Sequence, residues 1–330
     1  MKVKNIFNTI DTHTEGGPTR IITSGIPVLS GKTMKEKMDY FQSNLDHLRR
    51  VLMLEPRGRT GMFGAVITES TESQADAGVF FLTSSGYLSM CVHSAIGVGA
   101  AFLETGIIQQ SEEKKVIKLD TPAGLIDLEP KYSEEKLESL AIQTNPAFVH
   151  TDNALLDIGS DSPLKVSLVF SAVFFVLLDM KQLGMKVAQD NIPELVDLGV
   201  KVLEAANRSF KVSHPEHPDI KTIELALLYE EIEDKRAVNA VISRTGSLDR
   251  SPCGAGTGAK MAYLLQSDKL KLNEQYINEG VYGTKFTGQL IKAVHVGSYK
   301  GAIPRISGSA FITGIHQFIL DEHDPFQSGF

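Results

Sequence analysis

The sequence predicts an α/β (α+β) protein made of two similar halves, and three observations support this fold class. The chain has 330 residues, of which 42% are hydrophobic, enough for two domains of ordinary size. Each half contains a surface helix, then short strands, then one cysteine directly before a helix of small and apolar residues. Cys91 and Cys253 lie about half a chain length apart, which indicates a duplicated half.

In the first half, short strands joined by turns come before one surface helix. Residues 32–53 carry Met, Phe and Leu at helical spacing, which predicts that helix. Apolar runs of strand length with Gly and Ser breaks then occupy residues 61–88. The helix that follows Cys91 reads HSAIGVGAAFLETG, and Gly106 predicts its end. Cys91 is therefore expected at a helix N-terminus.

The second half repeats this order after a polar segment. Residues 143–163 are interrupted by Pro and Asn, so we expect the crossover between the halves there. The apolar run Val166–Asp179 is shorter than the roughly 20 residues that cross a bilayer, and its β-branched and aromatic residues predict one buried strand. The remaining predicted elements before Cys253 are a helix over 192–210 and strands over 222–229 and 237–243.

Composition excludes several functional classes. The net charge is −7 with both signs interspersed, and there is no basic run of the kind that nucleic acid or an anionic membrane requires. The N-terminal residues show no secretory signal, so a cytoplasmic location is expected. Two cysteines outside any CxxC pattern favour neither a disulfide framework nor a zinc site. The expected partner is a small-molecule substrate.

The positions of the two cysteines suggest acid/base chemistry. A helix start offers unpaired N–H groups and the positive end of the helix dipole, which stabilise a thiolate. Two such thiols facing one substrate can invert an α-carbon, one removing the α-proton and the other delivering a proton from the opposite side. No cofactor and no metal are required. The alternative is that Cys91 and Cys253 are small core residues, since free cysteine is usually buried.

Neighbouring residues favour the catalytic interpretation. His93 follows Cys91 by two residues, and Asp249 precedes Cys253 by four. Each would more often be a cap or a surface group if it stood alone. Gly254 permits a close approach of the backbone to a ligand. The segment DTHTEGGPTR predicts a tight polar turn between strands, either a structural loop or a ligand contact.

Taken together, five segments resemble the proline racemase family, which includes proline racemases, hydroxyproline 2-epimerases and trans-3-hydroxy-L-proline dehydratases. They are DRSPCGAGTGAK, MCVHSAIG, DTHTEGGPTR, EPRGRTGMFGA and GSAFITGIHQFILDEHDPFQSGF. The resemblance implies a fold like diaminopimelate epimerase, in which each domain is a curved, mostly antiparallel sheet wrapped round a central helix. It places the first domain at residues 1–155 plus about 308–330 and the second at 156–307. It also implies inversion without pyridoxal phosphate, and a possible homodimer.

The resemblance also assigns roles to individual residues. The acid/base pair would be Cys91 and Cys253, with His93 and Asp249 beside the thiols and the ring nitrogen of a proline or hydroxyproline substrate. The residues expected to hold the carboxylate through backbone N–H groups are Val92, His93, Gly254 and Ala255. Phe63 matches an aromatic wall of the ring pocket.

The sequence departs from the family pattern at four positions. Val92 stands where Gly is usual, Gly17 where an acidic residue is common and Arg59 where His is common. Ser243 replaces the second Phe of some proline racemases, which favours a hydroxyproline.

Three other functions compete with inversion. Family dehydratases typically carry Thr in place of the second cysteine, so Cys253 argues against dehydration. An acyclic amino-acid racemase would need a polar pocket, against which Phe63 argues. The third is an inactive binding or redox protein in which the cysteines form a disulfide.

Overall fold

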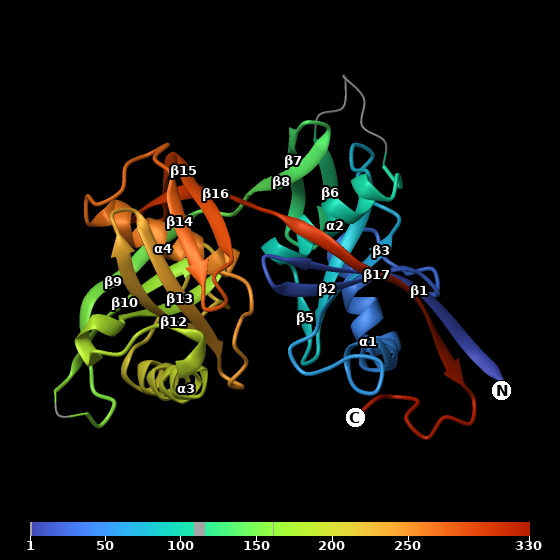
Figure 1. The fold of residues 1–330 in the computed structure, drawn as a ribbon, viewed down its shortest axis with the longest axis horizontal. Coiled ribbons are helices and arrows are strands. Elements are labelled where there is room, and N and C mark those ends of the chain that lie inside the picture. Colours follow the sequence, from blue (N-terminus) through green and yellow to red (C-terminus); the bar gives the residue numbers. More distant parts are fainter. Residues whose placement is uncertain (1, 109–115, 161) are drawn as a thin grey trace. The chain divides into compact units, whose positions relative to one another are not determined.

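The computed structural model describes residues 2–108, 116–160 and 162–330. The chain has a mixed α/β fold that divides into two compact units (Figure 1). Unit 1 comprises residues 1–142 and 308–330, and unit 2 comprises residues 143–307. The last strand of the chain therefore belongs to the first unit.

Unit 1 is a mostly antiparallel sheet with two long helices. Its helices are α1 (Met34–Met53) and α2 (Val92–Glu104). Its strands are β1 (Val3–Thr14), β2 (Gly17–Ser24), β3 (Phe63–Thr68), β4 (Ala77–Thr83), β5 (Tyr87–Leu88), β6 (Ile117–Thr121), β7 (Gly124–Ser133), β8 (Lys136–Gln143) and β17 (Ala310–Asp321). β1 pairs antiparallel with both β2 and β17, which run side by side with it in Figure 1. The parallel pairs are β2 with β3 and β4 with β6.

Helix α2 occupies the interior of unit 1. Every residue from Val92 to Phe102 is buried, and the helix contacts β1, β2, β3, β7 and β17. A Cβ at Gly97 would lie 2.7 Å from the Thr12 hydroxyl oxygen, so glycine permits this close packing. The α1 helix packs against β4 and β6 instead and joins a separate apolar cluster around Phe41 and Phe80.

Unit 2 has the same two kinds of element. Its long helices are α3 (Ile192–Ser209) and α4 (Gly254–Gln266), and its short 3₁₀ helices are Met180–Leu183 and Gln189–Asn191. Its strands are β9 (Ala147–Leu156), β10 (Leu164–Ser171), β11 (Val173–Asp179), β12 (Ile223–Glu233), β13 (Arg236–Ser243), β14 (Tyr276–Gly280), β15 (Lys285–Val296) and β16 (Tyr299–Gly308). Only the pairs β11 with β12 and β13 with β14 are parallel among the described strand pairs of this unit.

Helix α4 is largely buried and contacts β9, β10, β11 and β15. A Cβ at Gly258 would lie 2.7 Å from the Ser171 hydroxyl oxygen, which again shows close packing of helix on sheet. Helix α3 instead packs against β12 and β13 and contributes Leu195, Val202 and Leu203 to a second apolar cluster.

Two expectations from the sequence are wrong in detail. The run Val166–Asp179 is two strands, because the chain reverses at Ala172 with φ of 63°. Both strands are buried along most of their length, and the turn at Ser171 and Ala172 contains no glycine or proline that would signal it. Residues 143–155 were expected in the first domain, but β9 pairs with β10 and packs on α4, which places them in unit 2.

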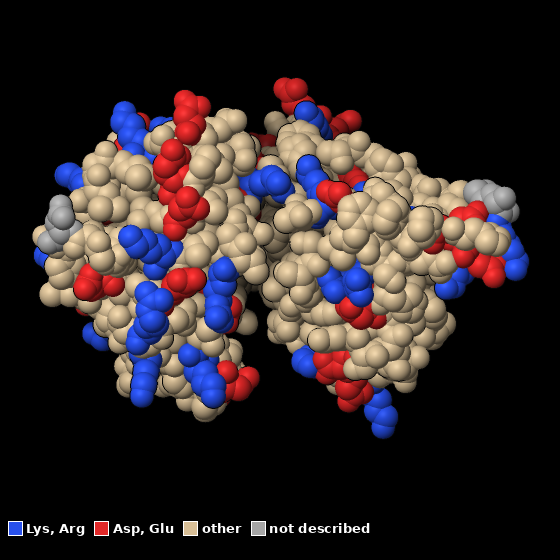
Figure 2. All heavy atoms as spheres, turned by 90° about the horizontal axis from the view of Figure 1, so that it is seen from below, with Lys and Arg blue, Asp and Glu red and all other residues tan. Residues whose placement is uncertain are grey.

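The surface carries both signs of charge. On the face of each unit seen in Figure 2, Lys and Arg lie interspersed with Asp and Glu. Among the described residues, no helix combines the length and the apolar character needed to cross a membrane.

Candidate active site

Cys91 lies at the N-terminus of α2, as the sequence predicts. It is the N-cap residue, its backbone is extended with φ of −147°, and only 9% of it is exposed. The first N–H groups of a helix have no carbonyl partner within the helix, so they face the region beside this thiol. Val92 occupies the first helical position and is also buried.

His93 contacts the Cys91 sulfur. Its ring nitrogens Nδ1 and Nε2 lie 3.6 and 3.8 Å from Sγ. Burial by itself would raise the pKa of the Cys91 thiol, but the charge of His93 and hydrogen bonds from His93 and Ser94 outweigh burial, so the pKa is lowered. This thiol is therefore prepared to ionise more readily than an ordinary cysteine.

Side chains from three strands hold the first turn of α2. Thr14 on β1 donates its hydroxyl to the His93 carbonyl at 2.7 Å, and Thr19 on β2 donates to the Ser94 hydroxyl at 3.0 Å. Phe63 on β3 meets the His93 ring edge-on, with 4.5 Å between centroids. The structure thus brings the predicted residues Cys91, Val92, His93 and Phe63 together.

The motif DTHTEGGPTR forms the β1–β2 hairpin. Its turn residues Glu15 and Gly16 both have positive φ, as a two-residue hairpin turn requires. Arg20 and Asp11 form a buried ion pair at 2.8 Å, and Arg20 also donates to the Leu52 carbonyl at 2.8 Å. These two charged residues therefore have structural partners within unit 1.

Cys253 lies at the N-terminus of α4 in a different conformation. Its φ is 62° and ψ is 106°, a region that residues other than glycine rarely adopt. The residue is 6% exposed, and its sulfur accepts the Gly256 N–H at 3.3 Å. The sequence predicts the helix start but gives no sign of this backbone conformation.

Asp249 is connected to Cys253 by hydrogen bonds through Ser251. The Asp249 carboxylate accepts both the Ser251 N–H at 2.9 Å and the Ser251 hydroxyl at 2.8 Å. The Ser251 oxygen in turn accepts the Cys253 N–H at 3.1 Å. Gly254 and Ala255 follow as the first residues of α4, so Asp249, Cys253 and the two predicted N–H donors belong to one local structure.

Ser243 ends β13, and its hydroxyl is engaged within its own loop. It lies 3.0 Å from the Thr245 hydroxyl and accepts the Ser247 N–H at 3.2 Å. The loop then continues to Asp249, whose N–H donates to the Val241 carbonyl at 2.9 Å. Ser243 thus shapes the segment that leads to Cys253.

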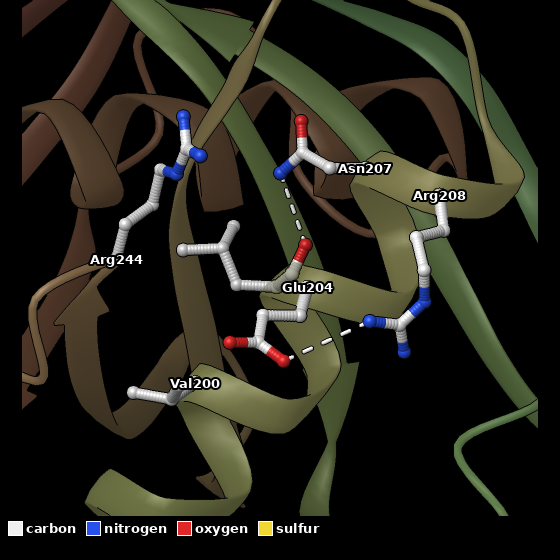
Figure 3. Close-up of a pocket in the computed structure, with 6 residues that line it drawn as sticks. Val200, Glu204, Asn207, Arg208 and Arg244 are labelled. Carbon is white, nitrogen blue, oxygen red and sulfur yellow. Dashed lines mark hydrogen bonds and ion pairs between the residues drawn. The ribbon is translucent and has the colours of Figure 1, made fainter.

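A cavity of about 320 Å³ lies along α3, and none of the predicted site residues lines it (Figure 3). It is lined by Val200, Leu203, Glu204, Asn207, Arg208 and Arg244. Glu204 pairs with Arg208, one turn further along the same helix, at 3.7 Å. Among the residues that the structure describes, no group of three or more His, Cys, Asp or Glu side chains is arranged to hold a metal ion.

Sequence reasoning missed two buried asparagines beside Cys253. Asn239 on β13 and Asn278 on β14 both donate to the carbonyl of Pro252, at 3.1 and 3.0 Å. No local pattern identifies them, because they lie in strands well removed from Cys253 in the sequence.

The chain is similar in sequence and structure to known proteins over its whole length. A proline racemase from Acetoanaerobium sticklandii is 39% identical, with 100% of this chain and 99% of that protein covered. A trans-3-hydroxy-L-proline dehydratase from Bacillus thuringiensis is 36% identical, with the same shares covered. A hydroxyproline epimerase from Agrobacterium vitis, solved with bound trans-4-hydroxy-L-proline, has a TM-score of 0.89 at 29% identity. That likeness covers 100% of this chain and 96% of the solved one.

More distant structures share the fold alone. A phenazine biosynthesis protein of the PhzF family from Bacillus anthracis has a TM-score of 0.60 at 14% identity, covering 96% of this chain and 99% of that one. The sequence profile described as proline racemase matches residues 9–330. From this match and the 39% identical relative, the chain belongs to the proline racemase family.

Proposed function

We propose that the protein is a cofactor-independent racemase or 2-epimerase that inverts the α-carbon of proline or a hydroxyproline. The observation that carries this proposal is that both cysteines of the chain are buried helix N-caps and that each sulfur has a polar partner. These partners are the His93 ring for Cys91 and the Gly256 N–H for Cys253. A buried core cysteine would need neither partner.

In the proposed reaction both thiols reach the same α-carbon from opposite faces. The thiolate of one cysteine takes the α-proton, so a C–H bond breaks and an S–H bond forms. The thiol of the other cysteine then delivers its proton to the opposite face of the carbanion. The negative charge passes from one sulfur to the other, and the substrate is neither oxidised nor reduced.

Backbone N–H groups would stabilise the charge that develops on the carboxylate. Val92 and His93 supply one pair at the start of α2, and Gly254 and Ala255 supply the other at the start of α4. Donors fixed in place before the reaction are more effective than water, because they need not reorganise. Val92 retains its N–H, so this role does not require the glycine that is usual there.

Phe63 and Ser243 are the residues proposed to determine whether the substrate is proline or a hydroxyproline. Phe63 offers an apolar wall braced against His93, which suits a pyrrolidine ring. Ser243 leaves room that a phenylalanine would fill, and its hydroxyl is already bonded to Thr245 and Ser247. The preference for a hydroxyproline therefore rests on space for the ring hydroxyl rather than on a bond from Ser243.

Dehydration of trans-3-hydroxy-L-proline is the second candidate. The relative from Bacillus thuringiensis that carries this name is 36% identical over the whole chain. Elimination needs one base on the α-proton face, whereas the partners of Cys253 favour a working second thiol.

The test is incubation of the reduced protein in D₂O with L-proline, trans-4-hydroxy-L-proline and trans-3-hydroxy-L-proline in turn. NMR follows deuteration at the α-carbon, and polarimetry follows configuration. We expect inverted, deuterated product from at least one of the first two substrates, and Cys91→Ser and Cys253→Ser should each abolish inversion. A ketimine-type product from the 3-hydroxy substrate without any inversion would favour dehydration, and no reaction with all three would overturn the proposal.

A further inference from the structure

The backbone of Cys253 needs external support. A residue with a side chain at φ of 62° and ψ of 106° is strained, and this conformation persists only where the surroundings hold it. Cys91, at the equivalent helix start, is extended and has no such cost. The contacts round Cys253 should therefore show what maintains its conformation.

Two buried amides hold the peptide group just before Cys253. Asn239 Nδ2 and Asn278 Nδ2 donate to the Pro252 carbonyl at 3.1 and 3.0 Å, and both asparagines are 2% exposed or less. Asn278 Nδ2 also donates to the Thr257 hydroxyl at 2.8 Å, and that hydroxyl donates to the Cys253 carbonyl at 2.8 Å. The carbonyls on both sides of the Cys253 α-carbon are thus fixed.

The asparagines are anchored in the sheet. They lie on β13 and β14, which pair in parallel, with Ala237 opposite Asn278 and Asn239 opposite Gly280. Among the described residues, the buried Asn239 Oδ1 has no hydrogen-bond partner. An unpaired buried acceptor destabilises the folded state, and a leucine of similar shape would carry no such acceptor. The Asn239 side chain contributes one hydrogen bond that leucine could not make, from Nδ2 to the Pro252 carbonyl.

We propose that Asn239 and Asn278 are positioning residues that turn the Pro252–Cys253 peptide and so aim the Cys253 sulfur at the Gly256 N–H. This inference deepens the proposed function and rests on it, because it assigns the two asparagines to the second acid/base thiol. Without the two amides the strained backbone relaxes toward an extended form. The sulfur then loses the N–H that stabilises its thiolate, and the pKa of the thiol rises.

The test measures the reactivity of each thiol without substrate. Wild type, Asn239→Leu and Asn278→Leu are partly alkylated with iodoacetamide from pH 5 to 10, and peptide mass spectrometry gives separate initial rates for Cys91 and Cys253. We expect alkylation of Cys253 at pH 7 to slow about tenfold in each variant, as its midpoint moves up by about one pH unit. Cys91 in the same molecule should not change, and kcat for inversion should fall about tenfold while KM stays within about twofold.

Asn207→Leu is the matched control, because Asn207 also bonds backbone carbonyls in unit 2, those of Leu203 and Ile223, without touching Cys253. It should leave both alkylation profiles unchanged. If Asn239→Leu does not fold, Asn239→Ser removes the same amide with a smaller side chain. An unmoved midpoint for Cys253 in folded variants overturns the proposal, and so does an equal change at Cys91, which would indicate general loosening. Because alkylation needs no turnover, failure of the proposed function would appear only in the inversion assay.

Discussion

The helix starts at Cys91 and Cys253 differ in the backbone conformation of the cysteine and in the partner of its sulfur. Cys91 is extended, and its sulfur is paired with the imidazole of His93. Cys253 has a positive φ, and its sulfur is paired with the N–H of Gly256. The first partner can gain or lose a proton, whereas the second cannot. One fold plan therefore offers two ways to stabilise a thiolate, one dependent on a neighbouring charge and one on backbone geometry.

The largest effect is expected from His93→Gln, which keeps a donor but removes the charge beside Cys91. Burial then prevails and raises the pKa of Cys91 above its ordinary value. We expect inversion to slow by about a thousandfold, within the range for loss of acid/base assistance. The checks are the rate of inversion in D₂O and the alkylation profile of each cysteine. An unchanged Cys91 profile would contradict the comparison, and Cys253 serves as the internal control.

A second difference lies deeper in the two helices. The buried part of α2, Val92–Phe102, contains no lysine, arginine or carboxylate, whereas α4 buries Lys260 completely. Lys260 Nζ lies 3.0 Å from Glu231 Oε1 and 3.3 Å from the centroid of the Tyr229 ring. Burial lowers its pKa to about 8, against the opposing charge of Glu231.

This lysine should make stability depend on pH. The unfolded chain keeps the lysine proton up to about pH 10.4, so between about pH 8 and 10.4 it binds more protons than the folded chain and stability rises with pH. The gain is on the order of 3 kcal/mol, roughly a hundredfold in the unfolding equilibrium. Urea unfolding at pH 7, 8, 9 and 10 should show this rise in wild type and not in Lys260→Met. The control is Lys269→Met, which removes an exposed partner of Glu231. Identical pH dependence in all three proteins would be the contrary result.

A smaller effect is expected from the serines that precede the cysteines by two residues. Ser251 is buried and accepts the Cys253 N–H, whereas Ser89 is exposed. Ser251→Ala leaves a buried N–H without its partner and should cost about 1–3 kcal/mol of stability and about tenfold in inversion rate. Ser89→Ala is the matched control and should change both by less than about twofold. Thermal unfolding measures the loss of stability, and the inversion assay measures the loss of rate. Equal losses in Ser251→Ala and Ser89→Ala would show that the two serines do not differ in their roles.

The sequence predicted the helix starts because their signals are local. Each cysteine is followed by small residues at helical spacing, and His93 and Asp249 lie within four residues of a cysteine. The helices over 32–53 and 192–210 were predicted almost to their ends: the structure has them at Met34–Met53 and Ile192–Ser209. The spacing of apolar residues along one helix is likewise a local signal.

What escaped prediction depends on contacts between distant segments. The positive φ of Cys253 is maintained by Asn239 and Asn278, which the sheet brings from strands on either side of α4 in the sequence. The reversal at Ala172 also lacks a glycine or a proline, the usual signal for such a turn. Hydrogen bonds between distant segments, and strands that are buried on both faces, produce no periodic pattern in the sequence. The conformation of Cys253 and the turn at Ala172 could therefore be found only in the structure.

The smallest effect concerns the residue after each cysteine, Val92 at one start and Gly254 at the other. Val92→Gly makes the two starts alike at this position and keeps the N–H proposed to hold the carboxylate. Because the carboxylate is common to proline and hydroxyproline, KM for both should change together, by no more than about threefold, and their ratio should stay constant. Loss of the buried isopropyl group and the greater flexibility of glycine should cost about 1–3 kcal/mol of stability, measured by urea unfolding. A changed ratio of the two KM values would mean that Val92 lies against the ring, and the N–H groups of the two helix starts would then have different roles.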